Sequence, residues 1–180
     1  MKKEVINLDI GAGAGKSFTR RAKENPDQYF VAMEPSTGRD FSPEASSPNI
    51  FWVKGRAEPL PIKSGSVDKV NIDFVFVFLY GEDREEGKNN DFHEEASRMI
   101  QEGLRAIKPG GSLLIREPRY MLRELAPIMS EMGVNFSSAL IPLEEAMEHS
   151  VSAREFAEEA NFGDKESHPY LIRIPKDGNL

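Results

Sequence analysis

The most informative segment of the sequence is a run of small residues that follows a short apolar stretch, Leu8-Asp9-Ile10-Gly11-Ala12-Gly13-Ala14-Gly15-Lys16-Ser17. Small residues between a strand and a helix let the backbone approach a ligand closely, and the helix N-terminus adds backbone N–H donors. Turns of this kind bind nucleotides and related cofactors in several classes of protein. The spacing of the glycines therefore has to decide among these classes.

That spacing disfavours two classes of nucleotide site. A phosphate-binding loop that ends in Gly-Lys-Ser needs a glycine five positions before its second glycine, and counting back from Gly15 that position holds Ile10. The dinucleotide fingerprint G-x-G-x-x-G fits Gly11 and Gly13, but its third glycine falls on Lys16. A nicotinamide oxidoreductase stays as an alternative that a cofactor titration would separate.

A third pattern, an acid just before G-x-G-x-G, fits at every position. Asp9 is followed by Gly11, Gly13 and Gly15. S-adenosylmethionine carries no phosphate, so such a turn makes room for its aminoacyl and ribose parts. The acid can hold the methionine ammonium directly or through water. The plain alternative is a tight strand–helix turn without a ligand, for which three glycines would be costly.

With this turn the sequence resembles class I S-adenosylmethionine-dependent methyltransferases over roughly residues 4–118. Glu34 stands where that family has an acid that binds the two ribose hydroxyls at the end of the second strand. The run Gly55-Arg56-Ala57-Glu58-Pro59-Leu60-Pro61 resembles the segment that borders the adenine, and residues 104–115 resemble the family's run into the fifth strand. The resemblance implies S-adenosylmethionine as cofactor and these contacts with it: Asp9, Gly11, Ala12, Gly13, Gly15, Glu34, Pro35, Arg56, Ala57, Glu58 and Asn71.

Three features depart from the family pattern. Arg56 stands where an Asp commonly contacts the adenine amine, so that contact must come from backbone or be absent. Residues 36–48 are rich in Ser, Pro and Gly and predict a loop in place of the usual helix. Little sequence precedes the first strand, so we expect the usual N-terminal lid over the substrate to be missing.

Polar residues at the end of the fourth strand are the candidates for chemistry on the acceptor. In open parallel sheets, ligands bind beyond the carboxyl ends of the strands, where Asn71 and Asp73 lie in an otherwise apolar run. Asp73 is our candidate for orienting or deprotonating the acceptor, with a structural capping role as the alternative. Correct positioning of the acceptor alone can supply much of the acceleration. The following Val75-Phe76-Val77 indicates core rather than a base-stacking platform.

The elements that must position these residues alternate between strands and helices. This order predicts a single α/β domain over residues 1–180 with a doubly wound, mostly parallel seven-stranded sheet and helices on both faces. We expect strands at 5–10, 29–33, 49–53, 67–74, 112–115 and 170–174, and helices at 15–24, 92–107, 120–132 and 143–161. In the first helix, Phe18 and Ala22 lie four apart and should face the sheet.

Composition limits the partners. The chain has 180 residues, a net charge of −7 and no cysteine, and this charge disfavours broad binding to nucleic acid. A stripe of Lys16, Arg20 and Lys23, with Arg21 beside it, could contact RNA phosphates, but a solvated face is the favoured interpretation. We predict no metal, since His93, His149 and His168 are widely separated. No membrane span or targeting signal is recognisable, so we expect a cytoplasmic protein.

The sequence therefore predicts methyl transfer from S-adenosylmethionine to an unidentified acceptor. On charge, a small molecule or a protein is favoured over RNA. The alternatives are a non-catalytic methyltransferase-like subunit that binds a protein partner, and a tRNA or rRNA base methyltransferase.

Overall fold

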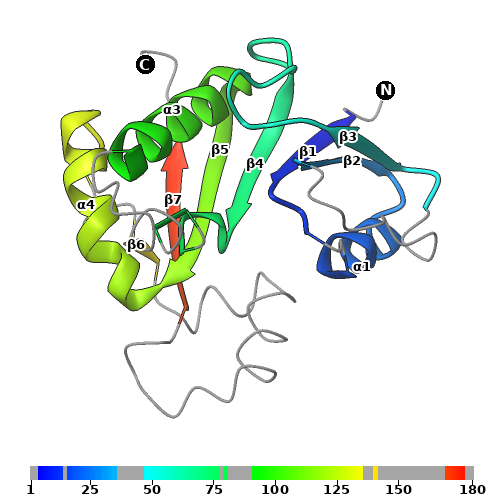
Figure 1. Cartoon of the computed structure of the whole chain (residues 1–180). Helices are drawn as coiled ribbons and strands as arrows, with labels where there is room; N and C mark the ends of the chain where they lie inside the picture. Colours follow the sequence, from blue (N-terminus) through cyan, green and yellow to red (C-terminus); the bar gives the residue numbers. More distant parts are fainter. Residues whose placement is uncertain are drawn as a thin grey trace. The chain divides into compact units, whose positions relative to one another are not determined.

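The structure of the chain is a computed structural model that describes residues 4–13, 16–35, 47–77, 79–80, 91–135, 140–141 and 169–176. Its strands and helices (Figure 1) follow in the order β1 (Val5–Ile10), α1 (Lys16–Glu24), β2 (Gln28–Glu34), β3 (Ile50–Lys54), β4 (Val67–Asp73), α3 (Asp91–Ala106), β5 (Ile107–Pro118), η2 (Arg119–Met121), α4 (Leu122–Glu131), β6 (Leu140–Ile141) and β7 (Pro169–Pro175). Residues 75–77 and 79–80 are also helical. Among the described residues, no helix is long and apolar enough to cross a membrane.

The strands follow the sheet order β3-β2-β1-β4-β5-β7-β6. β1 pairs in parallel with both β2 and β4, β2 pairs in parallel with β3, and β7 pairs antiparallel with β6, which has only two residues. The chain thus runs outward from β1 to β3 and then returns to the other side of β1. This confirms the predicted doubly wound, mostly parallel α/β sheet. The strand order switches between β1 and β4, where such sheets bind their ligands.

The fifth strand is longer than the sequence predicts. It covers Ile107–Pro118 rather than 112–115, because Pro109-Gly110-Gly111 continues the strand instead of forming a turn. The N–H of Gly110 donates to the carbonyl of Lys176 and the N–H of Lys176 donates to the carbonyl of Gly111, both at 2.9 Å. A Cβ at Gly111 would overlap the carbonyl oxygen of Asp68 and the side chain of Ile107, so this strand needs glycine there.

The remaining differences are at element ends. The expected helix at 120–132 is the 3-10 turn η2 followed by α4. The whole of the expected helix at 143–161 and most of the expected loop at 36–48 lie outside the described residues.

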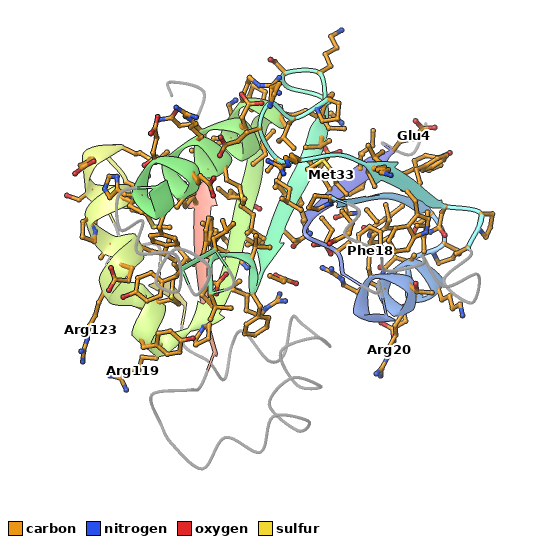
Figure 2. The ribbon with its side chains drawn as sticks, in the orientation of Figure 1. Glu4, Phe18, Arg20, Met33, Arg119 and Arg123 are labelled. Carbon is orange, nitrogen blue, oxygen red and sulfur yellow. The ribbon has the colours of Figure 1, made fainter. Side chains whose placement is uncertain are left out.

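The residues divide into two compact units, 1–73 with 102–113 and 175–180, and 74–101 with 114–174. In the first unit, α1 packs on β2 and β3. The ring of Phe18 meets the ring of Phe30 edge-on, with centroids 5.4 Å apart, and lies 6.4 Å from that of Trp52. Phe18 and Ala22 are buried as predicted. Figure 2 shows Phe18 pointing toward the sheet and Arg20 pointing away from it.

In the second unit, the apolar face of α3 is buried. Ala96, Met99 and Ile100 recur at the predicted helical spacing and are all buried. The ring of Phe92, at the start of α3, meets that of Tyr80 edge-on at 5.3 Å. The apolar residues of the η2–α4 segment are buried as well, namely Met121, Leu125, Ile128 and Met129.

Candidate cofactor site

The glycine-rich turn folds back onto the end of β2. The N–H groups of Gly11 and Ala12 donate to the carbonyl of Met33 at 2.9 and 3.2 Å. The N–H of Gly13 donates to Oε2 of Glu34 at 2.8 Å. Gly11 and Gly13 have φ values of 73° and 54°, which side-chain-bearing residues rarely adopt. The spacing of these glycines therefore shapes the turn, as the sequence predicts; Gly15 lies outside the described residues.

These hydrogen bonds also indicate which class of ligand the turn can bind. A phosphate-binding turn directs its backbone N–H groups at the anion. Here the three N–H groups of residues 11–13 are bonded to β2. This part of the turn therefore does not suit a phosphate. It suits a ligand that fits against small residues and donates hydrogen bonds to a carboxylate.

Glu34 is the carboxylate that the turn brings to this edge of the sheet. It is the last residue of β2, its side chain is half-buried, and its backbone carbonyl accepts a hydrogen bond from the N–H of Gly55 at 3.2 Å. Glu34 thus joins the glycine-rich turn to the segment that follows β3. The exposed Pro35 ends the described part of this region. A carboxylate in this place can accept hydrogen bonds from two neighbouring hydroxyl groups.

Asp9 forms a buried ion pair with Arg21, which we did not predict from the sequence. Its Oδ2 accepts a hydrogen bond from Nη2 of Arg21 at 2.6 Å, and the two side chains are 5% and 17% exposed. The guanidinium also lies 5.6 Å from the centroid of the Phe18 ring. Arg21 therefore turns inward, whereas Arg20 makes a half-exposed ion pair with Glu24 on the same helix. The signal that could have identified Arg21 in the sequence is the requirement of a buried acid for a counter-ion.

Asn71 and Asp73 lie on β4, next to β1. Asn71 is in register with Asp9, is buried, and donates from Nδ2 to the carbonyl of Leu8 at 3.4 Å. Asp73 is the last residue of β4 and is half-buried. The strand ends one residue earlier than predicted because Phe74 has a φ of 57°. Its N–H donates to the carbonyl of Arg116 at 2.8 Å.

The backbone after Asp73 is held by a residue that the sequence analysis did not select. Glu117, near the end of β5, is fully buried, and its carboxylate accepts hydrogen bonds from the N–H groups of Phe76 at 2.8 Å and Val77 at 3.2 Å. Phe76 is fully buried, in agreement with a core role.

Partial burial, followed by the charge of Glu117 and the nearby Tyr80, raises the pKa of Tyr120. That phenol is therefore neutral at neutral pH.

The segment predicted to border the adenine follows β3. Arg56 is exposed, Ala57 is buried and Glu58 is half-buried. The Arg56 side chain thus points into solvent in the place where the family commonly has an Asp. Within the described part of the chain, no group of three or more His, Asp or Glu side chains could hold a metal.

Comparison with known proteins assigns the family. Residues 8–115, which include the second half of β1, all of α1, β2, β3, β4 and α3, and most of β5, match the methyltransferase domain family. The chain belongs to this family. It is a class I S-adenosylmethionine-dependent methyltransferase domain.

Two curated relatives of this methyltransferase domain come from quinone biosynthesis. The demethylmenaquinone methyltransferase of Beutenbergia cavernae is 29% identical over 153 residues, which cover 85% of this chain and 56% of that protein. The ubiquinone/menaquinone biosynthesis C-methyltransferase of Pseudomonas paraeruginosa is 28% identical over 143 residues, covering 76% of this chain and 49% of that protein. The chain spans about half the length of the curated relatives it matches.

Solved methyltransferases share the fold at low sequence identity. An S-adenosylmethionine-dependent methyltransferase from Aquifex aeolicus superposes with a TM-score of 0.62 at 14% identity, covering 96% of this chain and 82% of that one. The 16S rRNA methyltransferase KamB superposes with a TM-score of 0.61 at 17% identity, covering 96% and 88%. At these identities the likeness supports the fold alone.

The residues present fit S-adenosylmethionine. The turn at residues 11–13 carries no side chain larger than a methyl group, its described N–H groups are not directed at a phosphate, and the Glu34 carboxylate lies against it. A ribose with two free hydroxyls matches an acidic acceptor of this kind.

Proposed function

We propose that this domain transfers a methyl group from S-adenosylmethionine to a small-molecule acceptor. The observation that carries the proposal is the closure of the Gly11–Gly13 turn on Glu34, at the switch in strand order between β1 and β4. When bound, S-adenosylmethionine supplies a methyl group that is already activated by its positively charged sulfur. The protein therefore has to bind and orient the two reactants.

On this proposal each residue of the site has a defined task. Glu34 binds the ribose hydroxyls, and the N–H of Gly13 keeps its carboxylate in place. The small residues of the turn leave room for the aminoacyl group. Asp9, tied to Arg21, holds the turn on α1 and directs negative charge toward the ammonium. The proposed cofactor contacts further include Gly15, Pro35, Arg56, Ala57, Glu58 and Asn71.

Asp73 is the residue that we propose orients the acceptor. It ends β4 at the edge of the sheet where ligands bind, and the left-handed Phe74 follows it directly. A left-handed conformation costs a bulky residue about 1–3 kcal/mol and persists only where the surroundings impose it. The hydrogen bonds that this segment donates to the Arg116 carbonyl and the Glu117 carboxylate impose it here, and they fix the direction in which the chain leaves Asp73.

The acceptor class rests on charge and on the relatives. A net charge of −7 disfavours nucleic acid, and two curated relatives carry the names of quinone-biosynthesis methyltransferases. We therefore infer a small molecule of the reduced, hydroxylated aromatic class as acceptor.

We also propose that residues 1–180 act as one domain, since β5 contributes residues to both compact units. The cytoplasmic location stays a prediction.

The test is a transfer assay with methyl-labelled S-adenosylmethionine, supplied in parallel with a reduced demethylated quinone and with RNA. We expect label in the quinone and none in RNA, and loss of transfer in Asp73→Ala. Label in RNA alone would contradict the proposed acceptor. Binding of S-adenosylhomocysteine without transfer to either substrate would support the non-catalytic subunit instead.

A further inference from the structure

A pair of charged residues on α3 organises the segment between β3 and β4. Residues 55–66, all of them described, form turns rather than a helix or a strand. A segment of this kind needs partners from elsewhere to hold one conformation. Glu102 and Arg105 provide several of them.

The contacts are dense and directed at backbone. Oε2 of Glu102 accepts a hydrogen bond from the N–H of Leu60 at 3.0 Å. Arg105 donates to the carbonyls of Leu60 at 3.1 Å and Ile62 at 2.9 Å, and to the Ser64 hydroxyl at 3.0 Å. Three backbone groups of residues 60–62 are thus bound by two side chains.

The two side chains also fix each other. Nε and Nη2 of Arg105 donate to the two oxygens of the Glu102 carboxylate at 2.9 and 2.7 Å. Such a two-point pair fixes orientation as well as distance. The hydrogen bond from Arg105 holds the pKa of Glu102 below its usual range. The pair therefore stays charged and intact at neutral pH.

This pair anchors one end of the segment, and Glu34 anchors the other. The N–H of Gly55 donates to the Glu34 carbonyl, and residues 60–64 are held by the pair, so residues 56–59 span the interval between the two anchors. Because the Arg56 side chain is exposed, it does not turn inward to read the edge of the adenine base. Recognition then falls to the half-buried Glu58 and to backbone N–H and carbonyl groups, whose positions the two anchors determine.

We propose that Glu102 and Arg105 are positioning residues that give the cofactor site its selectivity for adenine, an inference that rests on the proposed cofactor site. Adenine and hypoxanthine differ at one edge, where an amino donor becomes a carbonyl acceptor and a ring nitrogen gains a hydrogen. A backbone held in one place distinguishes these edges, because the wrong base leaves polar groups unpaired. A loosened backbone loses that distinction.

The test compares the affinities for S-adenosylhomocysteine and S-inosylhomocysteine by calorimetry in wild type, Arg105→Ala, Glu102→Gln and the control Arg98→Ala. Arg98 lies on the same helix in an exposed ion pair with Glu94. We expect wild type and Arg98→Ala to prefer the adenosyl ligand. In Arg105→Ala and Glu102→Gln, we expect that preference to fall at least about fivefold, mainly through weaker adenosyl binding.

The outcomes separate this inference from the proposed function. If wild type does not bind S-adenosylhomocysteine, the proposed cofactor site is wrong. If wild type binds both ligands equally, or if folded Arg105→Ala and Glu102→Gln keep the wild-type preference, the positioning role is wrong. Glu102→Gln keeps an acceptor for the Leu60 N–H and most of the side-chain volume. It therefore tests the positioning role even if Arg105→Ala does not fold.

Discussion

At the scale of single residues, charge burial determines what the acid of the glycine-rich turn can do. Asp9 lies in a buried strand and is paired with Arg21 at 2.6 Å. A buried carboxylate without a cation would be protonated or would destabilise the fold. The pair therefore gives Asp9 a counter-ion and connects β1 to α1 across the turn.

The first prediction concerns this pair. Removing one partner of a buried ion pair costs about 3–5 kcal/mol because the other charge stays behind. We expect Asp9→Asn and Arg21→Met each to lower the free energy of unfolding by about this amount. The double variant should lose clearly less than the sum, since it leaves no charge behind. Urea denaturation measures all three.

Arg20→Met is the matched control. Arg20 is on the same helix, in a half-exposed pair with Glu24, and exposed pairs contribute about 0–1 kcal/mol. Strictly additive losses in the double variant would show that Asp9 and Arg21 are not coupled.

At the scale of elements, carboxylates on α3 and β5 bind the backbone of the two segments that flank β4. Glu102 binds the backbone before β4 and Glu117 binds the backbone after it. Residues 55–66 form turns and residues 75–77 are helical, and one buried or half-buried acid accepts hydrogen bonds from the backbone of each segment.

The second prediction is for Glu117. Glu117→Ala leaves the N–H groups of Phe76 and Val77 without their acceptor, and each unsatisfied buried group costs about 1–3 kcal/mol. We expect a loss of about 2–4 kcal/mol in the free energy of unfolding, and a smaller loss in Glu117→Gln, which keeps one acceptor oxygen. Thermal and chemical denaturation check both values.

The control is Glu131→Ala, because Glu131 is exposed and contacts His93 at 3.5 Å on the surface. Equal stability of Glu117→Ala and Glu131→Ala would rule out a structural role for the buried carboxylate.

The third prediction is the pH dependence of the Glu102–Arg105 pair. The pKa of Glu102 is lowered in the folded protein from the ordinary value of 4.5, chiefly by the hydrogen bond from Arg105. A carboxyl with a lowered folded-state pKa stabilises the fold fully above its unfolded pKa, and this stabilisation is lost as pH falls through the folded value. We expect wild type to exceed Glu102→Gln in stability at neutral pH and the difference to shrink below pH 4.5. A difference that does not change with pH would contradict the account.

The order of strands and helices predicted the doubly wound sheet, but what the sequence could predict of the site was local. The glycine spacing and Glu34 lie within or next to single elements, and their chemistry follows from residue type. The pairs that were missed join distant positions: Asp9 and Arg21 are 12 residues apart, Leu60 and Glu102 are 42 apart, and Phe76 and Glu117 are 41 apart. Periodicity does not specify such contacts, because they depend on how the strands are ordered. The strand at 107–111 was missed for the same reason, since its partner is Lys176.

At the scale of the whole molecule, the chain builds its candidate site from several separated segments. The glycine-rich turn, Glu34, the segment after β3 and the end of β4 all belong to the first compact unit. The family assignment covers residues 8–115, which includes all four. The site therefore lies within the part of the chain that the methyltransferase domain family matches.

The most direct test of this account is a calorimetric titration of S-adenosylhomocysteine and NAD into wild type, Glu34→Ala and the exposed control Glu24→Ala. The account predicts that wild type and Glu24→Ala bind S-adenosylhomocysteine with the same affinity and do not bind NAD. Hydrogen bonds to a charged group contribute about 1.5–3 kcal/mol, so Glu34→Ala should weaken binding roughly tenfold to a hundredfold. Equal binding by Glu34→Ala and wild type, or tighter binding of NAD, would contradict the assignment of this turn to S-adenosylmethionine.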